Sequence, residues 1–228
     1  MIKFLAKGLI RDRSRSLFPL LTIIITVTLV IFGIGFMEGA MNNFLQSTAV
    51  ISSGHVKVVT KAYEKESSQL PNDLALFETN KIIQNLSDLY PNYFWTPRIT
   101  FGGLLDTPNE NGETKEQGPV FGIGIDFHSK TSRQIEIWEL EKYLLHGNLP
   151  KNTNDALIST KLAKQLSVNI GSTVTLISTT MDNAFTTYNF EITGIFNLNK
   201  GQVDRQMMLV DISGARQALG MEGAASEI

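Results

Sequence analysis

Side chains that could do chemistry are few and scattered in this sequence. The three histidines, His55, His128 and His146, each lack a second histidine or a carboxylate at the spacing of a metal site such as H-E-x-x-H. The sequence has no cysteine nucleophile, no G-x-S-x-G elbow and no G-x-x-x-x-G-K-[ST] phosphate-binding loop. We therefore expect no catalytic residue, no metal ligand and no bound cofactor, and no hydrolysis of ATP by a P-loop in this chain.

Two other patterns favour a structural interpretation over a chemical one. Gly122-Ile123-Gly124 begins like a dinucleotide-binding fingerprint, but a third glycine and the following helix are missing. It predicts a strand whose glycines pack close to a neighbour. Glu136, Glu139 and Glu141 fall on a predicted helix and indicate its solvated face.

Charge divides the chain into two unlike parts. The 228 residues carry a net charge of −2, but the segment up to Met37 has five basic residues and one acidic residue, or +4. The remainder has 15 basic (20 − 5) and 21 acidic (22 − 1) residues, or −6. A nucleic-acid-binding protein is excluded as an interpretation, because the larger part would repel phosphate. The basic residues of the first part are Lys3, Lys7, Arg11, Arg13 and Arg15, and its acidic residue is Asp12.

Residues 17–37 form an uncharged apolar run of 21 residues that predicts a transmembrane helix. As a helix it would be roughly 31 Å long, enough to cross a hydrocarbon core of about 30 Å. A cleaved signal peptide is the alternative, but the run is longer than a signal peptide needs and no small-x-small cleavage site follows it. The preceding residues 1–16 are basic, so we expect a cytoplasmic amino terminus and an extracytoplasmic main part.

The flanks of this run carry two weaker patterns. Residues 1–16 predict either a short interfacial helix on an anionic leaflet or a basic flank without a shape of its own. Gly35 and Gly39 form a G-x-x-x-G, which would allow another membrane helix to pack closely. Residues 38–47 are expected to continue the helix outward as a stalk.

Residues 48–228 predict an extracytoplasmic domain of the α+β class, because strand-like and helix-like runs follow one another without sustained βαβ repetition. The character of the sequence changes near Pro150, after which two long β-rich runs follow one another. Expected strands are 55–59, a pair within 93–105 interrupted at Gly102-Gly103, 120–125, 156–159, 172–180, 187–196 and 206–210. Expected helices are 135–145, 160–166, 212–219 and one with Leu76, Ile83, Leu86 and Tyr90 on one face; 63–73 is expected to be a loop.

Two exposed connections are candidate partner contacts. One is the acidic hairpin tip Asp106 to Gln117, and the other is the turn Met181, Asp182, Asn183, Ala184 and Phe185. Loops on a rigid scaffold commonly carry binding residues. The alternative for both is an ordinary solvated turn.

Eight short segments follow one another along the chain: 53–58 (SGHVKV), 96–99 (TPRI), 124–126 (GID), 146–149 (HGNL), 156–159 (ALIS) with 162–166 (LAKQL), 169–174 (NIGSTV), 190–196 (FEITGIF) and 215–219 (ARQAL). Each alone is a weak motif. In this order they resemble successive segments of one family, the ABC transporter permeases of the MacB, FtsX and lipoprotein-releasing (LolC/LolE-like) type, and the resemblance covers nearly the whole chain.

The resemblance implies one membrane helix, a two-lobed periplasmic core domain built of a βαβ-type lobe and an inserted β-rich lobe, and three further membrane helices. The lobes implied are about 48–150 with 205–228, and about 151–204, and the change near Pro150 agrees with this division. The sequence is therefore expected to be a fragment that lacks the last part of the core domain. It departs from the lipoprotein-releasing branch at Asn197 to Lys200, where that branch commonly has a glycine-rich turn.

The function implied is mechanotransmission, in which a separate cytoplasmic P-loop ATPase moves the permease, and the periplasmic lobes act on a lipoprotein, peptide or drug-like substrate. Further partners implied are a second permease copy or paralogue and a periplasmic or outer-membrane protein, in the bacterial inner membrane. The alternative function is a single-pass anchored adaptor or ligand-binding module that has no ATPase partner.

Overall fold

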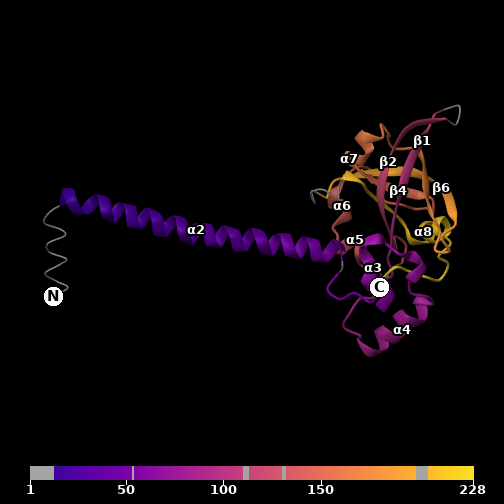
Figure 1. Cartoon of the computed structure of the whole chain (residues 1–228), viewed down its shortest axis with the longest axis horizontal. Helices are drawn as coiled ribbons and strands as arrows, with labels where there is room; N and C mark the ends of the chain where they lie inside the picture. Colours follow the sequence, from indigo (N-terminus) through magenta and orange to yellow (C-terminus); the bar gives the residue numbers. More distant parts are fainter. Residues whose placement is uncertain (1–12, 53, 110–112, 130–131, 199–204) are drawn as a thin grey trace. The chain divides into compact units, whose positions relative to one another are not determined.

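The computed structural model describes residues 13–52, 54–109, 113–129, 132–198 and 205–228, and the chain separates into two compact units at Ser52/Ser53. The first unit is the helix α2 (Arg13–Ser52), 40 residues long (Figure 1). Residues 38–47 are helical, as predicted for the stalk. The helix also continues through residues 48–52, where the sequence predicted the domain to begin.

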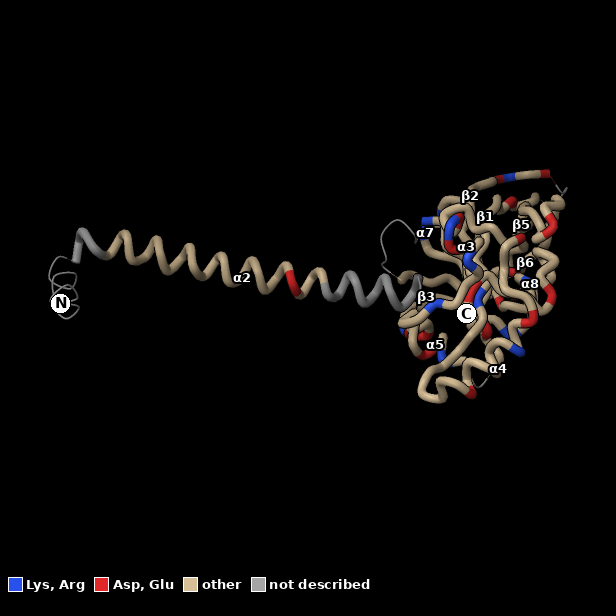
Figure 2. The backbone as a smooth tube through the Cα atoms, turned by 60° about the horizontal axis from the view of Figure 1, so that its bottom comes forward, with Lys and Arg blue, Asp and Glu red and all other residues tan. Residues whose placement is uncertain are grey.

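Residues Leu17–Met41 of α2 have the length and composition of a membrane span, 25 residues with a mean hydropathy of 2.6. Glu38 is the one charged residue in this stretch (Figure 2). The hydroxyls of Thr22 and Thr26 donate to the carbonyls of Phe18 and Thr22 at 2.9 and 2.8 Å. Both polar groups are thus satisfied within the helix, which is what a hydrocarbon environment requires.

The second unit is built around a mixed sheet that closes on itself. The strand order is β3-β6-β4-β7-β2-β1-β5, and β5 also pairs with β6. Closure is possible because β6 is long: residues 185–191 pair with β5, and residues 191–196 pair with β4. Its strands are β1 (Ile99–Pro108), β2 (Thr114–Ile125), β3 (Leu144–Gly147), β4 (Asp155–Ser159), β5 (Thr173–Thr179), β6 (Phe185–Phe196) and β7 (Met207–Asp211).

The ring contains two parallel pairs, β2–β7 and β4–β6, among antiparallel ones. β4 and β7 are buried at every position, which explains their short, nearly continuous apolar sequences. Both sides of Pro150 contribute strands to the ring. The division of the domain into two lobes stays a prediction.

Helices cover the ring and connect its strands. α8 (Ile212–Leu219) packs against β1, β2, β6 and β7, and α7 (Thr160–Gln165) packs against β4 and β6. Ala215, Ala218 and Leu219 place the apolar face of α8 in the core. The remaining helices are α3 (Lys61–Glu66), η1 (Ser67–Gln69), η2 (Asn72–Leu74), α4 (Thr79–Leu89), α5 (Gln134–Ile137) and α6 (Leu140–Tyr143).

Five sequence expectations about local structure were wrong. Leu76 and Tyr90, expected on one helix with Ile83 and Leu86, lie outside α4, and Leu76 instead forms a β-bridge with Ala225.

Residues 63–73 are not a loop, because 63–69 and 72–73 belong to α3, η1 and η2. Residues 93–105 are not a strand pair, because β1 passes through Gly102-Gly103 without a break. Residues 135–145 are not one helix, since Glu139 adopts a left-handed conformation (φ 51°) between α5 and α6. Residues 55–59 do not form a strand of the sheet, although Val58 exchanges two backbone hydrogen bonds with Ile228.

Three extended segments meet at the carboxyl end of the described chain. Arg98 and Glu227 exchange two backbone hydrogen bonds, and Val58 and Ile228 do the same. The side chain of Glu227 is 2% exposed and forms ion pairs with Arg98 (2.6 Å) and Lys57. Arg98 also lies over the buried ring of Trp138, 5.9 Å from its centre. This cluster joins the start of the domain, the start of β1 and residues 225–228.

Glycines in β2 allow close packing, as the Gly122-Ile123-Gly124 pattern predicted. A Cβ at Gly122 would lie 2.0 Å from the ring of Phe101, its cross-strand partner, and a Cβ at Gly124 would lie 2.6 Å from the Cβ of Ala215. Phe101 fills the space above Gly122, and α8 approaches β2 at Gly124. Gly122 and Gly124 therefore leave room for the side chain and the helix that pack against β2.

We predict that Gly122→Ala lowers the free energy of unfolding by about 1–3 kcal/mol, because the new methyl group overlaps an aromatic side chain that is fixed inside the ring of strands. The measurement is denaturant unfolding of the detergent-solubilised chain, followed by near-UV circular dichroism.

Gly102→Ala is the matched control. It lies in the same strand pair, and its new Cβ would meet only Leu70 at an ordinary 3.8 Å. Equal unfolding midpoints for the two variants would contradict the packing role assigned to Gly122. Recovery of stability in Gly122→Ala with Phe101→Leu would support it.

Candidate functional site

The turn predicted as a partner contact connects β5 to β6. The N–H of Thr180 donates to the carbonyl of Ala184 at 2.8 Å, and the N–H of Asn183 donates to the carbonyl of Thr180 at 3.0 Å. Asn183 has a φ of 59°, a left-handed conformation that asparagine tolerates well. The turn at 181–184 is confirmed, and Phe185 is the first residue of β6.

Side chains of this turn divide into an anchor and an exposed pair. Met181 is half-buried against the core, and its N–H donates to the carbonyl of Leu219 at the end of α8 (2.9 Å). Phe185 is 75% exposed, and Asp182 is also exposed. A fixed turn that presents an aromatic ring and a carboxylate to solvent has the form of a contact site, and that role stays a prediction.

A polar hollow of about 440 Å³ lies beside the turn. One wall is the segment from Glu66 to Asp73, which follows α3, and the opposite wall runs from Ser178 to Asn183. Phe101 and Gly102 of β1 also line it. The sequence did not reveal this site, because 63–73 was expected to be a loop and nothing in its composition indicates that it faces the end of β5.

The predicted acidic hairpin tip is shorter in the structure, because its two ends are strand. β1 extends to Pro108 and β2 begins at Thr114, so much of the expected connection 106–117 is strand. Asn109 and Glu113 close the hairpin: the N–H of Asn109 donates to the carbonyl of Glu113 (2.8 Å), and the N–H of Glu113 donates to Oδ1 of Asn109 (2.9 Å). Residues 110–112 lie outside the described part of the chain.

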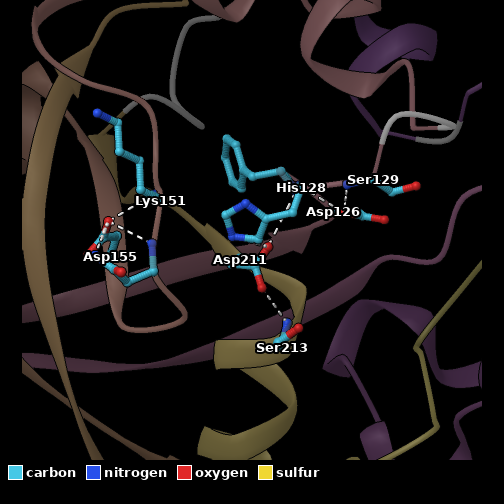
Figure 3. A network of polar contacts seen from close by, with 9 residues as sticks. Asp126, His128, Ser129, Lys151, Asp155, Asp211 and Ser213 are labelled. Carbon is cyan, nitrogen blue, oxygen red and sulfur yellow. Dashed lines mark hydrogen bonds and ion pairs between the residues drawn. The ribbon is translucent and has the colours of Figure 1, made fainter.

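Three carboxylates gather where neighbouring strands of the ring end or begin (Figure 3). Asp211 ends β7, and Asp126 follows the parallel strand β2. Asp211 lies 3.6 Å from Nε2 of His128 and accepts a hydrogen bond from the N–H of Ser213. The sequence indicated an isolated histidine at His128, because Asp211 lies far from it along the chain.

Each of these carboxylates holds a loop or a helix start in place. Oδ1 of Asp126 accepts from the N–H groups of His128 (3.0 Å) and Ser129 (2.8 Å). Oδ2 of Asp155, at the start of β4, accepts from the N–H groups of Lys151 (2.8 Å) and Asn152 (3.0 Å). Among the described residues, no group of three or more His, Cys, Asp or Glu side chains lies close enough together to hold a metal ion. The network therefore has a structural function in fixing the strand connections.

Arg216 of α8 connects this network to the other side of the helix. Its guanidinium donates to the carbonyl of Ala224 (3.1 Å) and to the hydroxyl of Thr79 (3.2 Å), which lies in α4. Burial lowers the pKa of Arg216 from its ordinary value, and the carboxylates of Asp126 and Asp211 partly oppose that shift. Arg216 thus holds α4 and residues 221–225 against α8.

The other sequence candidates lie apart from these sites. His55 and His146 are exposed. Glu136 and Glu139 form exposed ion pairs with Arg133 and Lys142, both at 2.8 Å, which agrees with a solvated face. A Cβ added at Gly35 or Gly39 of α2 would meet no atom of the described residues within 4 Å, apart from its own helix backbone and its chain neighbours. Packing of another membrane helix there stays a prediction.

Comparison with curated proteins found no match. Among solved structures, the chain is similar to the periplasmic region of MacB from Actinobacillus actinomycetemcomitans, with 15% sequence identity and a TM-score of 0.46. That similarity covers 81% of this chain and 77% of the MacB structure. The family model of the MacB-like periplasmic core domain matches residues 16–227, almost the whole chain. The chain therefore belongs to the family of the MacB-like periplasmic core domain, within the MacB/FtsX-like ABC transporter permeases.

Proposed function

We propose that this chain is the part of an ABC transporter permease that transmits ATP-driven movement to a domain outside the membrane. The observation that carries the proposal is a long apolar helix followed directly by a MacB-like core domain. The substrate class proposed is a lipoprotein, a peptide or a drug-like molecule.

The continuity of α2 supports transmission of movement. At about 1.5 Å per residue its 40 residues extend about 60 Å, and the segment Leu17–Met41 suited to a membrane is about two-thirds of that length. The helix then continues to Ser52, and the second unit begins at Ser53. A displacement of the helix end would therefore reach the domain through a short stretch of chain.

Shortly after α2 the chain is held in the domain by the cluster around Glu227. Lys57 and Val58 are both bound there, by an ion pair to Glu227 and by two backbone hydrogen bonds to Ile228. From Glu227 the contacts continue to Arg98 and into β1. We infer that movement of α2 enters the domain at this cluster.

Charge at the amino terminus supports the orientation of the proposal. The five basic residues before the span favour a cytoplasmic amino terminus in a bacterial inner membrane, with residues 54–228 on the periplasmic side. The partner proposed for ATP hydrolysis is a cytoplasmic P-loop ATPase subunit, as the resemblance to this family of permeases implies. A second permease copy or paralogue would complete the membrane part, and Gly35 and Gly39 would lie at a helix contact within it.

We predict that the chain, expressed in its own cells as part of its full permease and purified in mild detergent, copurifies with a protein that has a P-loop. The purified complex should hydrolyse ATP, and mutation of the P-loop lysine in the partner should abolish hydrolysis. A purified permease with no such partner would contradict the proposal and favour the anchored adaptor.

We propose that the turn Met181–Phe185 contacts a partner protein outside the membrane. The support is its rigid attachment to Leu219 and the exposure of Phe185 and Asp182. Aromatic side chains in fixed positions commonly dominate the affinity of protein interfaces.

We predict that Asp182→Asn with Phe185→Ser reduces export by the assembled transporter at least tenfold while protein levels stay normal. Met181 is retained in this variant, because replacing a half-buried side chain would disturb folding as well as the proposed contact. Asp88→Asn with Leu89→Ser is the control, since it removes one charge and one exposed apolar side chain (71% exposed) at the end of α4. Equal export by both variants would refute the contact.

A further inference from the structure

The polar hollow has the size and composition of a binding site. Its volume of about 440 Å³ falls within the range of about 300–1,000 Å³ typical of pockets that hold small ligands. Its walls come from two separate parts of the chain, residues 66–73 and residues 178–183, with β1 between them. Most of its lining side chains are polar.

The walls are held in place by side-chain hydrogen bonds to β1. The amide of Asn72 donates to the carbonyl of Thr100 (3.1 Å) and accepts from the hydroxyl of Ser226 (2.7 Å). On the opposite wall the hydroxyl of Ser178 donates to the carbonyl of Gly102 (2.8 Å). The hollow is therefore preformed, so a ligand would not have to order its walls.

Charge in the hollow has one sign. Glu66 and Asp73 line it, and no lysine, arginine or histidine does. Within the described residues neither carboxylate forms an ion pair or a side-chain hydrogen bond. Three exposed glutamates of this domain, Glu78, Glu136 and Glu139, each pair with a basic residue three positions away. Glu66 and Asp73 have no such cation among the described residues, and, unlike the equally unpaired Glu222, they line a hollow.

Neutral polar side chains surround the two carboxylates. Gln69, Thr179 and Asn183 line the hollow, and their side chains make no hydrogen bond to any other described residue. Amide and hydroxyl groups can bind both the N–H and the C=O groups of a peptide backbone. The two carboxylates can thus accept hydrogen bonds from a cationic side chain. The amide and hydroxyl groups can bind the peptide backbone to which that side chain belongs.

We propose that the hollow binds a lysine or arginine side chain on an extended segment of a partner protein outside the membrane. This inference rests on the proposed function, since it assigns the chemistry of the partner that the domain meets. The hollow adjoins the turn through Thr180 and Asn183, so the basic segment and the turn would belong to one contact surface.

The test measures binding of a fluorescein-labelled Gly-Arg-Gly-Arg-Gly peptide to the purified full chain in detergent, by fluorescence anisotropy at low salt. We expect saturable binding that weakens as salt is added, and no binding of Gly-Glu-Gly-Glu-Gly. Glu66→Gln with Asp73→Asn should weaken binding about tenfold, because each neutral side chain loses a charge-assisted hydrogen bond.

Glu222→Gln with Asp88→Asn is the matched control, because it removes the same charge from exposed positions outside the hollow and should leave the affinity unchanged. Circular dichroism checks that both variants are folded. Equal affinity of the two variants, or no binding by the unaltered chain, would overturn the proposal. The binding assay contains no ATPase, so it tests peptide binding by the hollow alone. The transporter assignment is tested separately, by copurification of a P-loop protein.

Discussion

The buried carboxylate of Glu227 is the interaction on which the arrangement of the domain depends. Three extended segments meet at it, and each would otherwise leave a charge or a backbone group without a partner. A carboxylate that is 2% exposed is stable as an ion only when cations compensate its lost hydration, and Arg98 and Lys57 provide them. Because Lys57, Arg98 and Glu227 are distant in sequence, their meeting fixes the start of the domain against β1 and against residues 225–228.

The rest of the domain can be followed from this cluster. β1 begins at Ile99, directly after Arg98, and pairs with β2, which carries Gly122 and Gly124 so that Phe101 and α8 can approach. α8 in turn holds α4 through Arg216 and holds the Met181–Phe185 turn through Leu219. The turn, the polar hollow and the segment after α2 are therefore connected through a few packed contacts. This connectivity is what a domain needs if movement of a membrane helix is to reach a surface that contacts a partner.

Sequence periodicity predicted the parts whose neighbours are local. The apolar helix, α7, α8 and the buried strands β4 and β7 were confirmed, since their apolar patterns reflect burial that any compact fold would give them. Periodicity failed where a distant contact decides the local structure: residues 63–69 turn helically where the Tyr63 hydroxyl hydrogen-bonds to Thr100. The pair of His128 with Asp211 and the hollow were missed for the same reason. The order of eight weak motifs predicted the family correctly, because it contains long-range information that no single motif has.

The ion pairs of Glu227 hold the segment after α2 to the domain, so removing their charge with Glu227→Gln should destabilise it. The variant keeps the size of the side chain but leaves Arg98, 7% exposed, without its counter-charge. Denaturant unfolding of the purified chain should show a loss of about 3–5 kcal/mol for Glu227→Gln, while exposed Glu222→Gln should change stability by less than about 0.5 kcal/mol. Equal unfolding midpoints for Glu227→Gln and the unaltered chain would contradict the account.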